Sequence, residues 1–269
     1  MIDQPVIEAE NLNRTFRRGG WLSRGAEIVA VRDATFAVAR GETLAIVGES
    51  GSGKSTIARM LVGLESPTRG AIRLEGEDLS TLKGRDRRML GRRIQYVFQD
   101  PVASLNPRHR IGEILGNTLK RLAGMANAAG RRACMEELLH HVGLEAEALQ
   151  RYPHEFSGGQ AQRIAIARAL AAHARIIVLD EPVSALDVSV QAQVLLLLDR
   201  LKAEFDLTYV FISHDLAVVE AICDRVMVMQ GGEIVETGPA EKLFAAPRAA
   251  YTRSLLASAP RLDQASETL

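Results

Sequence analysis

The residues whose types and spacing most clearly indicate a chemical function form a glycine-rich stretch at 48–56, with the sequence GESGSGKST. This stretch matches the phosphate-binding pattern G-x-x-x-x-G-K-[ST] at every fixed position. Glycines let the backbone wrap around a phosphate, and the N–H groups at the start of a following helix favour an anion. In this pattern Lys54 neutralises the β- and γ-phosphates of a nucleotide, and the Ser55 hydroxyl is a ligand of Mg²⁺. The predicted nucleotide contacts are Gly48, Glu49, Ser50, Gly51, Ser52, Gly53, Lys54, Ser55 and Thr56.

The residues on either side of this loop favour a strand before it and a helix after it. Residues 43–47 form a short run typical of a buried strand, and apolar residues recur at helical spacing from Ile57 to Leu64. The spacing is not that of a dinucleotide fingerprint, because no third glycine follows Gly51 and Gly53 three residues on. A glycine-rich loop that only turns the chain is the alternative, and the match of both pattern and context argues against it.

Polar side chains follow three further runs that predict strands. They are Gln99 after residues 94–98, Asp180 and Glu181 after 176–179, and His214, in the polar stretch 213–215, after 209–212. In an α/β sheet, the carboxyl ends of the strands often face the ligand crevice. Asp180 can hold Mg²⁺ through water, Glu181 can polarise an attacking water, and His214 could contact a γ-phosphate. The alternatives are a solvated acidic turn and a structural histidine.

Residues 101–173 differ from the rest of the chain, because helical periodicity dominates and no strong strand signal is present. We interpret them as an inserted helical subdomain. Within it, Ser157, Gly158, Gly159 and Gln160 precede an alanine-rich segment at 161–172. Ser157 is typical of a helix N-cap, and the exposed N–H groups after it can receive an anion. An ordinary loop and cap is the alternative.

An aromatic ring near the N-terminus could stack on an adenine, since every base offers a π-face. Phe16 is the first candidate and Trp21, in the following polar stretch, is a weaker one. A packing role for Phe16 is the alternative. Net charge is zero over 269 residues, so no bulk field favours nucleic acid. No apolar run approaches the roughly 18 residues that span a bilayer, so work at a membrane would require other chains.

Taken together, these segments resemble the ATP-binding subunit of an ABC transporter over nearly the whole chain. Residues 48–56 are similar to the Walker A loop, and Gln99 is similar to the Q-loop glutamine. Residues 157–160 resemble the ABC signature, and Asp180 and Glu181 resemble the Walker B aspartate and the catalytic glutamate. Residues 184–187 resemble the D-loop, and His214 resembles the switch histidine. Phe16 falls where the family places its adenine-stacking aromatic. No other P-loop class combines these parts in this order.

The resemblance implies an α/β fold with a P-loop NTPase (RecA-like) core, an antiparallel β subdomain and an inserted helical ABC subdomain. Residues 1–100 and 174–240 would form the nucleotide-binding core, 101–173 the helical insert, and 241–269 a C-terminal extension. It also implies ATP hydrolysis with Glu181, His214 and Gln99 as catalytic residues. The implied cofactors are ATP and Mg²⁺, with Ser55, Gln99 and Asp180 around the metal.

Finer strings at 98–107, 152–157 and 250–256 resemble the peptide/nickel branch of ABC importers. This branch implies a peripheral protein at the cytoplasmic face of the inner membrane. Its partners would be membrane-spanning permease subunits, a second ATPase subunit in a head-to-tail dimer and, indirectly, a solute-binding protein. The alternative is a soluble ABC ATPase of a non-transport complex, such as one of phosphonate breakdown.

Overall fold

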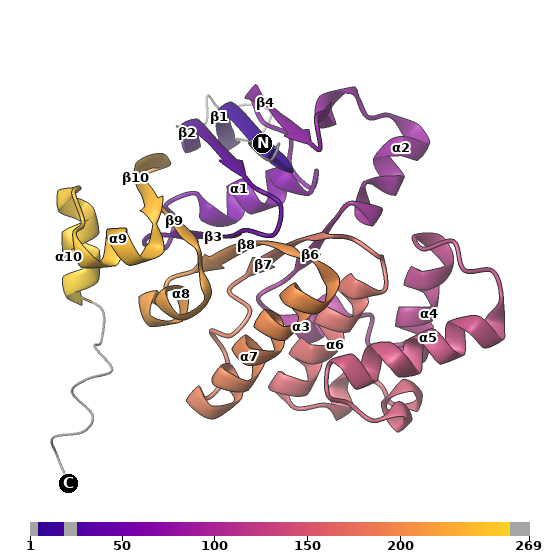
Figure 1. Cartoon of the computed structure of the whole chain (residues 1–269). Helices are drawn as coiled ribbons and strands as arrows, with labels where there is room; N and C mark the ends of the chain where they lie inside the picture. Colours follow the sequence, from indigo (N-terminus) through magenta and orange to yellow (C-terminus); the bar gives the residue numbers. More distant parts are fainter. Residues whose placement is uncertain (1–4, 19–25, 259–269) are drawn as a thin grey trace, which may run out of the picture. The chain divides into compact units, whose positions relative to one another are not determined.

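The computed structural model describes residues 5–18 and 26–258 of the chain (Figure 1). The chain folds as two units: the first comprises residues 1–81 and 210–269, and the second comprises residues 82–209. The Trp21 candidate lies outside the described residues.

An antiparallel sheet opens the first unit and confirms the predicted β subdomain. Its strands lie in the order β2 (Ala26–Val38), β1 (Ile7–Arg18), β4 (Arg69–Leu74) and β5 (Glu77–Asp78). Ile7 lies at the centre, because it pairs with Val38 on one side and Leu74 on the other. All three of these side chains are fully buried, so one face of the sheet packs against the core of this unit.

The strand before the glycine-rich loop is β3 (Thr43–Val47), and it is buried at every position. It pairs in parallel with β9 (Arg225–Gln230), and β9 pairs antiparallel with β10 (Glu233–Pro239). A strand buried on both faces needs apolar side chains throughout, which explains the unbroken run in the sequence. The other elements of this unit are α1 (Lys54–Leu61), η1 (Leu79–Thr81), α8 (Leu216–Ile222), α9 (Ala240–Ala245) and α10 (Ala250–Ser258), and β8 (Thr208–Ser213) enters it from the second unit.

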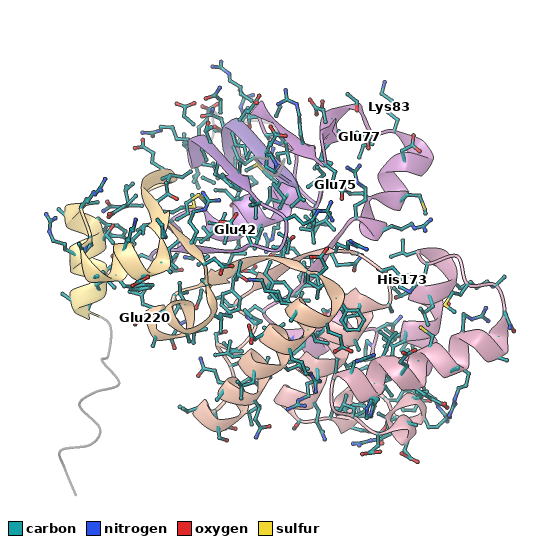
Figure 2. All side chains as sticks on the ribbon, in the orientation of Figure 1. Glu42, Glu75, Glu77, Lys83, His173 and Glu220 are labelled. Atoms are coloured by element: carbon teal, nitrogen blue, oxygen red, sulfur yellow. The ribbon has the colours of Figure 1, made fainter. Side chains whose placement is uncertain are left out.

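Charged groups fix the start of β3. The Glu42 carboxylate, labelled in Figure 2, accepts a hydrogen bond from Arg225 with Oε1 and Nε 2.6 Å apart. The Asp224 carboxylate accepts the Thr43 N–H at 2.7 Å. Only 13% of the Glu42 side chain and 30% of the Arg225 side chain are exposed, so solvent screens this pair less than a surface pair. Strand β3, which precedes the glycine-rich loop, is therefore fixed against the start of β9 by these contacts.

Helices dominate the second unit. Its elements are α2 (Gly84–Met89), η2 (Leu90–Arg92), β6 (Ile94–Val97), α3 (Pro101–Ser104), α4 (Ile111–Arg121), α5 (Ala128–His141), η3 (Ala146–Gln150), η4 (Pro153–Glu155), α6 (Gly158–Leu170), β7 (Ile176–Asp180) and α7 (Val188–Phe205). Its two strands pair in parallel, with Tyr96 opposite Val178. Every element within residues 101–173, all of which are described, is helical. The division of the chain at 101, 173 and 240 stays a prediction.

Helix α6 forms the centre of this helical part. Its buried residues fall on every side of the helix and are mostly alanine and isoleucine. Burial on every side is expected of a central helix, and small side chains let neighbouring helices approach closely. Among the helices of the described residues, none is long and apolar enough to cross a membrane.

Candidate functional site

Two glycines of the loop are required by backbone conformation and by space. Gly48 has a φ of 147° and Gly53 one of 106°, values that residues with a Cβ rarely adopt. A Cβ on Gly48 would lie 2.2 Å from the carbonyl oxygen of Met229, and one on Gly53 would lie 2.3 Å from that of Ala30. The loop therefore runs directly against the backbones of β9 and β2, and larger residues at these two positions would displace it.

The ammonium of Lys54 lies inside the loop. Its Nζ donates hydrogen bonds to the carbonyl oxygens of Gly48 at 2.8 Å and Glu49 at 2.7 Å. The residue is only 6% exposed, and a buried charge is tolerated when hydrogen bonds replace its water. The loop thus holds a cation at the position where the sequence pattern predicts the phosphates of a nucleotide.

A buried tyrosine contacts the first acidic residue after β7. The Tyr96 hydroxyl donates to Asp180, with the Tyr96 oxygen and Oδ2 2.5 Å apart, and both residues are buried. The parallel register of β6 and β7 brings these side chains together. Tyr96 is not among the site residues predicted from the sequence. A tyrosine within a run that predicts a strand was the available signal, since a buried tyrosine usually needs a partner.

The next acidic residue is held by the Q-loop candidate. The Gln99 amide donates to Glu181, with Nε2 and Oε2 2.8 Å apart. Glu181 has a φ of 48°, which is uncommon for a residue with a side chain and costs conformational free energy. The Ser184 N–H and hydroxyl both donate to the Glu181 carbonyl oxygen, at 3.3 and 3.2 Å, which holds this turn. The turn and the contact with Gln99 therefore restrict the orientation of the Glu181 side chain after β7.

Ser157 is the helix N-cap that the sequence predicted. Its hydroxyl accepts the Gln160 N–H at 3.4 Å, and the Gln160 side chain accepts the Ser157 N–H at 3.1 Å. This reciprocal arrangement is a capping box. A Cβ on Gly159 would lie 2.4 Å from Val190 Cγ1, so the start of α6 packs tightly against α7. The cap presents a small, exposed surface at Ser157 and Gly158.

The remaining two candidates belong to the first unit. Phe16, on β1, is half-buried, and the Arg14 guanidinium lies over its ring at 4.5 Å from the centroid. Arg14 is fixed in turn by Glu65, at 2.6 Å. His214 is exposed at the end of β8, before the Asp215 that caps α8. The structure thus places Phe16, residues 48–56 and His214 in the first unit, and Gln99, residues 157–160, Asp180 and Glu181 in the second.

The side chains predicted to surround Mg²⁺ carry oxygen atoms that can act as metal ligands. They are the hydroxyl of Ser55, the amide of Gln99 and the carboxylate of Asp180. Mg²⁺ prefers oxygen ligands, commonly one or two carboxylates together with phosphates and water. Gln99 uses its Nε2 to contact Glu181, which leaves the amide oxygen as its acceptor atom. The donor chemistry of these residues fits the ion.

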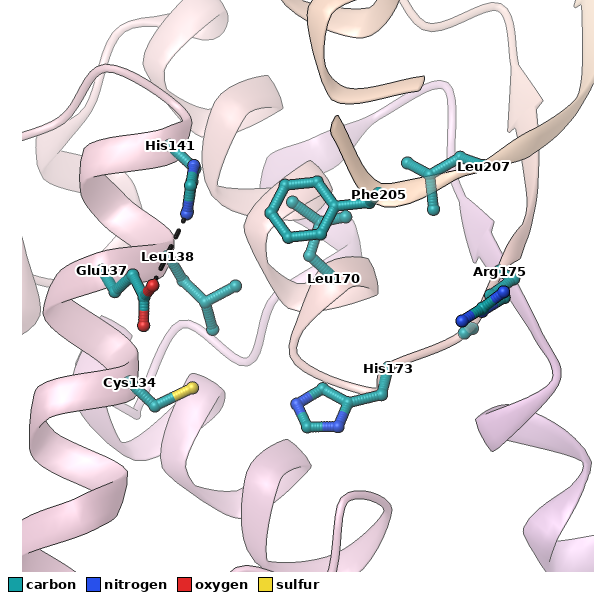
Figure 3. Close-up of a pocket in the computed structure, with 10 residues that line it drawn as sticks. Cys134, Glu137, Leu138, His141, Leu170, His173, Arg175, Phe205 and Leu207 are labelled. Atoms are coloured by element: carbon teal, nitrogen blue, oxygen red, sulfur yellow. Dashed lines mark ion pairs between the residues drawn. The ribbon is translucent and has the colours of Figure 1, made fainter. Parts of the chain in front are cut away.

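The second unit also contains a pocket of about 340 Å³ that none of the predicted site residues lines (Figure 3). Its polar wall is formed by Cys134, Glu137, His141, His173 and Arg175, beside the apolar side chains of Leu138, Leu170, Phe205 and Leu207. His141 Nε2 lies 3.8 Å from Glu137 Oε1, and its Nδ1 lies 3.0 Å from Glu204. Burial and then the Glu137 charge raise the pKa of the Cys134 thiol, so this group stays protonated at neutral pH.

A family model described as ABC transporter matches residues 31–184 of the chain. The oligopeptide transport ATP-binding protein of Streptococcus mutans is 44% identical over 262 residues, which cover 97% of this chain and 84% of that protein. The dipeptide transport ATP-binding protein of Haemophilus influenzae is 46% identical over 260 residues, which cover 96% of this chain and 79% of that protein.

Two solved structures share the fold. An ATP-binding cassette solved as a dimer in a post-hydrolysis state, bound to ADP and Pi, has a TM-score of 0.77 and 29% identity, with 87% of this chain and 98% of that chain covered. A protein of Clostridium perfringens that is part of an ABC transporter complex has a TM-score of 0.78 and 26% identity, with 91% and 92% covered. These matches confirm the predicted P-loop NTPase fold.

Proposed function

Because this chain belongs to the ABC transporter family, we propose that it is the ATP-hydrolysing subunit of an importer for peptides. The observation that carries the ATPase assignment is the glycine-rich loop that holds the Lys54 ammonium inside it. The names of the relatives from Streptococcus mutans and Haemophilus influenzae favour peptides over nickel or other small solutes. They also favour transport over a non-transport complex such as one of phosphonate breakdown.

ATP binding begins at the loop. Within the loop at 48–56, the N–H groups at the start of α1 surround the β- and γ-phosphates. Lys54, held inside the loop by the Gly48 and Glu49 carbonyls, donates to phosphate oxygens, and such charge-assisted hydrogen bonds contribute about 1.5–3 kcal/mol each. Phe16 stacks on the adenine, and Arg14 behind it keeps the ring in place. Affinity for the nucleotide thus comes from one charged and one apolar contact on the same chain.

Ser55, Gln99 and, through water, Asp180 would hold Mg²⁺, which would supply neutralisation of the negative charge on the phosphates when bound with ATP. The Tyr96 hydroxyl donates to one carboxylate oxygen of Asp180 and so fixes the orientation of the other. Side chains that orient a metal ligand in this way are commonly important for the affinity of the site for the metal ion.

Hydrolysis uses the carboxylate of Glu181 as the general base. It accepts a proton from a water molecule, whose oxygen attacks the γ-phosphorus in line with the bridging oxygen. A new P–O bond forms while the bond between the γ-phosphorus and the bridging oxygen breaks, which yields ADP and inorganic phosphate. Gln99 orients Glu181 through the hydrogen bond described above, and His214 contacts the γ-phosphate and responds to its loss.

The second half of each site comes from another ATPase subunit. In a head-to-tail dimer, Ser157 to Gln160 of one chain cover the ATP held by the loop of the other. That a related cassette bound to ADP and Pi was solved as a dimer supports an assembly of two subunits. ATP draws the two chains together through its γ-phosphate, and hydrolysis releases them. The helical segment 101–173 passes this motion to membrane-spanning permease subunits.

The proposed location is the cytoplasmic face of the inner membrane, where the permease holds the protein and a solute-binding protein acts indirectly. The test is growth of a deletion strain on a dipeptide that supplies a required amino acid. Wild-type protein should restore growth and Glu181→Gln should not. Unchanged dipeptide uptake together with lost growth on a phosphonate would instead support the non-transport alternative.

A further inference from the structure

A C-terminal helix of the first unit contacts the glycine-rich loop. Helix α10 begins at Ala250, and its start is fixed to β10 because the Glu236 carboxylate accepts the N–H groups of Arg248 at 2.8 Å and Ala249 at 3.0 Å. Tyr251 lies in the first turn of this helix. Its hydroxyl oxygen accepts a hydrogen bond from the Glu49 N–H at 3.1 Å. A residue 202 positions away in sequence therefore reaches the loop backbone.

The peptide group that Tyr251 contacts is the one that also binds the lysine. The Glu49 N–H and the Gly48 carbonyl belong to a single peptide unit. Its N–H donates to Tyr251, and its oxygen accepts from Lys54 Nζ at 2.8 Å. Hydrogen bonds in such a chain polarise one another, so the contact at the N–H strengthens the carbonyl as an acceptor for the ammonium. Tyr251 and Lys54 are thus linked through one amide.

This peptide unit needs an external support. Gly48 lacks a Cβ, so the peptide group that follows it can rotate over a wider range than after any other residue. A larger side chain cannot restrict that rotation, because a Cβ at this position would overlap the Met229 carbonyl. The hydrogen bond from outside the loop is therefore the available means of fixing the direction of the Gly48 carbonyl.

We infer that Tyr251 is a positioning residue for the phosphate-binding loop. It holds the Gly48–Glu49 peptide unit in the orientation that places the Lys54 ammonium inside the loop, and it thereby raises affinity for ATP. The C-terminal helix is then part of the nucleotide site rather than an appendage. This inference rests on the proposed function, because it assumes that the loop binds ATP.

The test variant is Tyr251→Phe, which keeps the ring and removes only the oxygen. Loss of one supporting hydrogen bond should raise the Kd and the KM for ATP about three- to tenfold and leave kcat nearly unchanged. Hydrogen exchange at the Glu49 amide should become faster in the nucleotide-free protein. A role in helix packing alone would move neither KM nor this amide.

The matched control is Tyr209→Phe, which removes another tyrosine hydroxyl that bonds a backbone group. That oxygen lies 3.0 Å from the Leu198 carbonyl, in the second unit. This variant should lower the melting temperature and leave the ATP affinity and the Glu49 amide unchanged. Wild-type affinity and wild-type Glu49 exchange in Tyr251→Phe would overturn the inference. A wild-type protein that does not bind ATP would overturn the proposed function instead, and Glu49 exchange would still decide whether Tyr251 fixes the loop.

Discussion

The side-chain amide of Gln99 donates a hydrogen bond to the carboxylate of Glu181, with the two atoms 2.8 Å apart. Gln99 follows β6 and Glu181 follows β7, so the parallel pairing of these strands brings them together. Glu181 also has a positive φ, a conformation that proteins tend to keep at functional positions. The hydrogen bond from Gln99 and the unusual backbone conformation both restrict the Glu181 side chain, as expected for a positioned general base.

Glu181→Gln should stop ATP turnover while ATP binding persists. The amide keeps the size of the side chain and can still hydrogen-bond with Gln99, but it cannot accept a proton from water. Loss of general base catalysis lowers rates about 100-fold or more. Phosphate release and equilibrium nucleotide binding measure the two effects separately, and an ATP-bound closed dimer should accumulate.

The control for this variant is Glu220→Gln, which makes the same chemical change at an exposed position of α8 (Figure 2). It should hydrolyse ATP at the wild-type rate. If Glu181→Gln does so too, Glu181 is not the catalytic base.

Phe16→Ala should weaken nucleotide binding. Stacking of a base on an aromatic ring contributes about 1–3 kcal/mol, which corresponds to about a five- to 150-fold change in Kd. Arg14 should remain in place, because Glu65 and the Ser66 carbonyl also hold its guanidinium. Titration with a fluorescent nucleotide measures the change, and Trp21→Ala is the comparison. Equal affinities in the two variants would show that Phe16 only packs against its neighbours.

The sequence predicted the elements that depend on local patterns. The strand before Gly48, the helix after Gly53 and the cap at Ser157 all follow from short motifs and apolar periodicity. Contacts such as Tyr96 with Asp180 and Tyr251 with Glu49 join residues 84 and 202 positions apart. These contacts depend on strand register and on where a terminal helix packs, and no local pattern encodes either.

The stability of α7 should depend on pH through Asp187. The Val190 N–H and then the Ser189 hydroxyl lower the pKa of this carboxyl, because both hydrogen bonds favour the charged form. A lowered pKa stabilises the fold above the unfolded value and loses that effect as pH falls through the folded value. Asp187→Asn keeps an oxygen for the cap but has no charge.

Melting temperatures of the wild type and Asp187→Asn should therefore differ at about pH 6 and converge towards about pH 3, with the wild type higher at the upper value. The control is Asp199→Asn, an exposed position within the same helix. A difference between wild type and Asp187→Asn that is constant across this range would mean that the Asp187 charge does not act at the cap.

Lys54 and Ser157 should act on different nucleotides, although both are predicted phosphate ligands. Lys54 lies inside the loop of its own chain, so Lys54→Ala should weaken ATP binding about ten- to 100-fold even in a dilute, monomeric sample. Ser157→Arg should leave that monomeric binding unchanged and still abolish steady-state turnover, because a bulky cation replaces the small exposed cap that we propose covers the opposing chain's ATP.

Ser157→Ala separates bulk from capping in this experiment. It removes the hydroxyl that accepts the Gln160 N–H and should lower stability by about 1 kcal/mol, yet it adds no side chain that blocks the approach of a second subunit. Turnover should fall far less in Ser157→Ala than in Ser157→Arg. If Ser157→Arg instead weakens monomeric ATP binding as strongly as Lys54→Ala does, both residues serve the same nucleotide, and the head-to-tail arrangement is wrong.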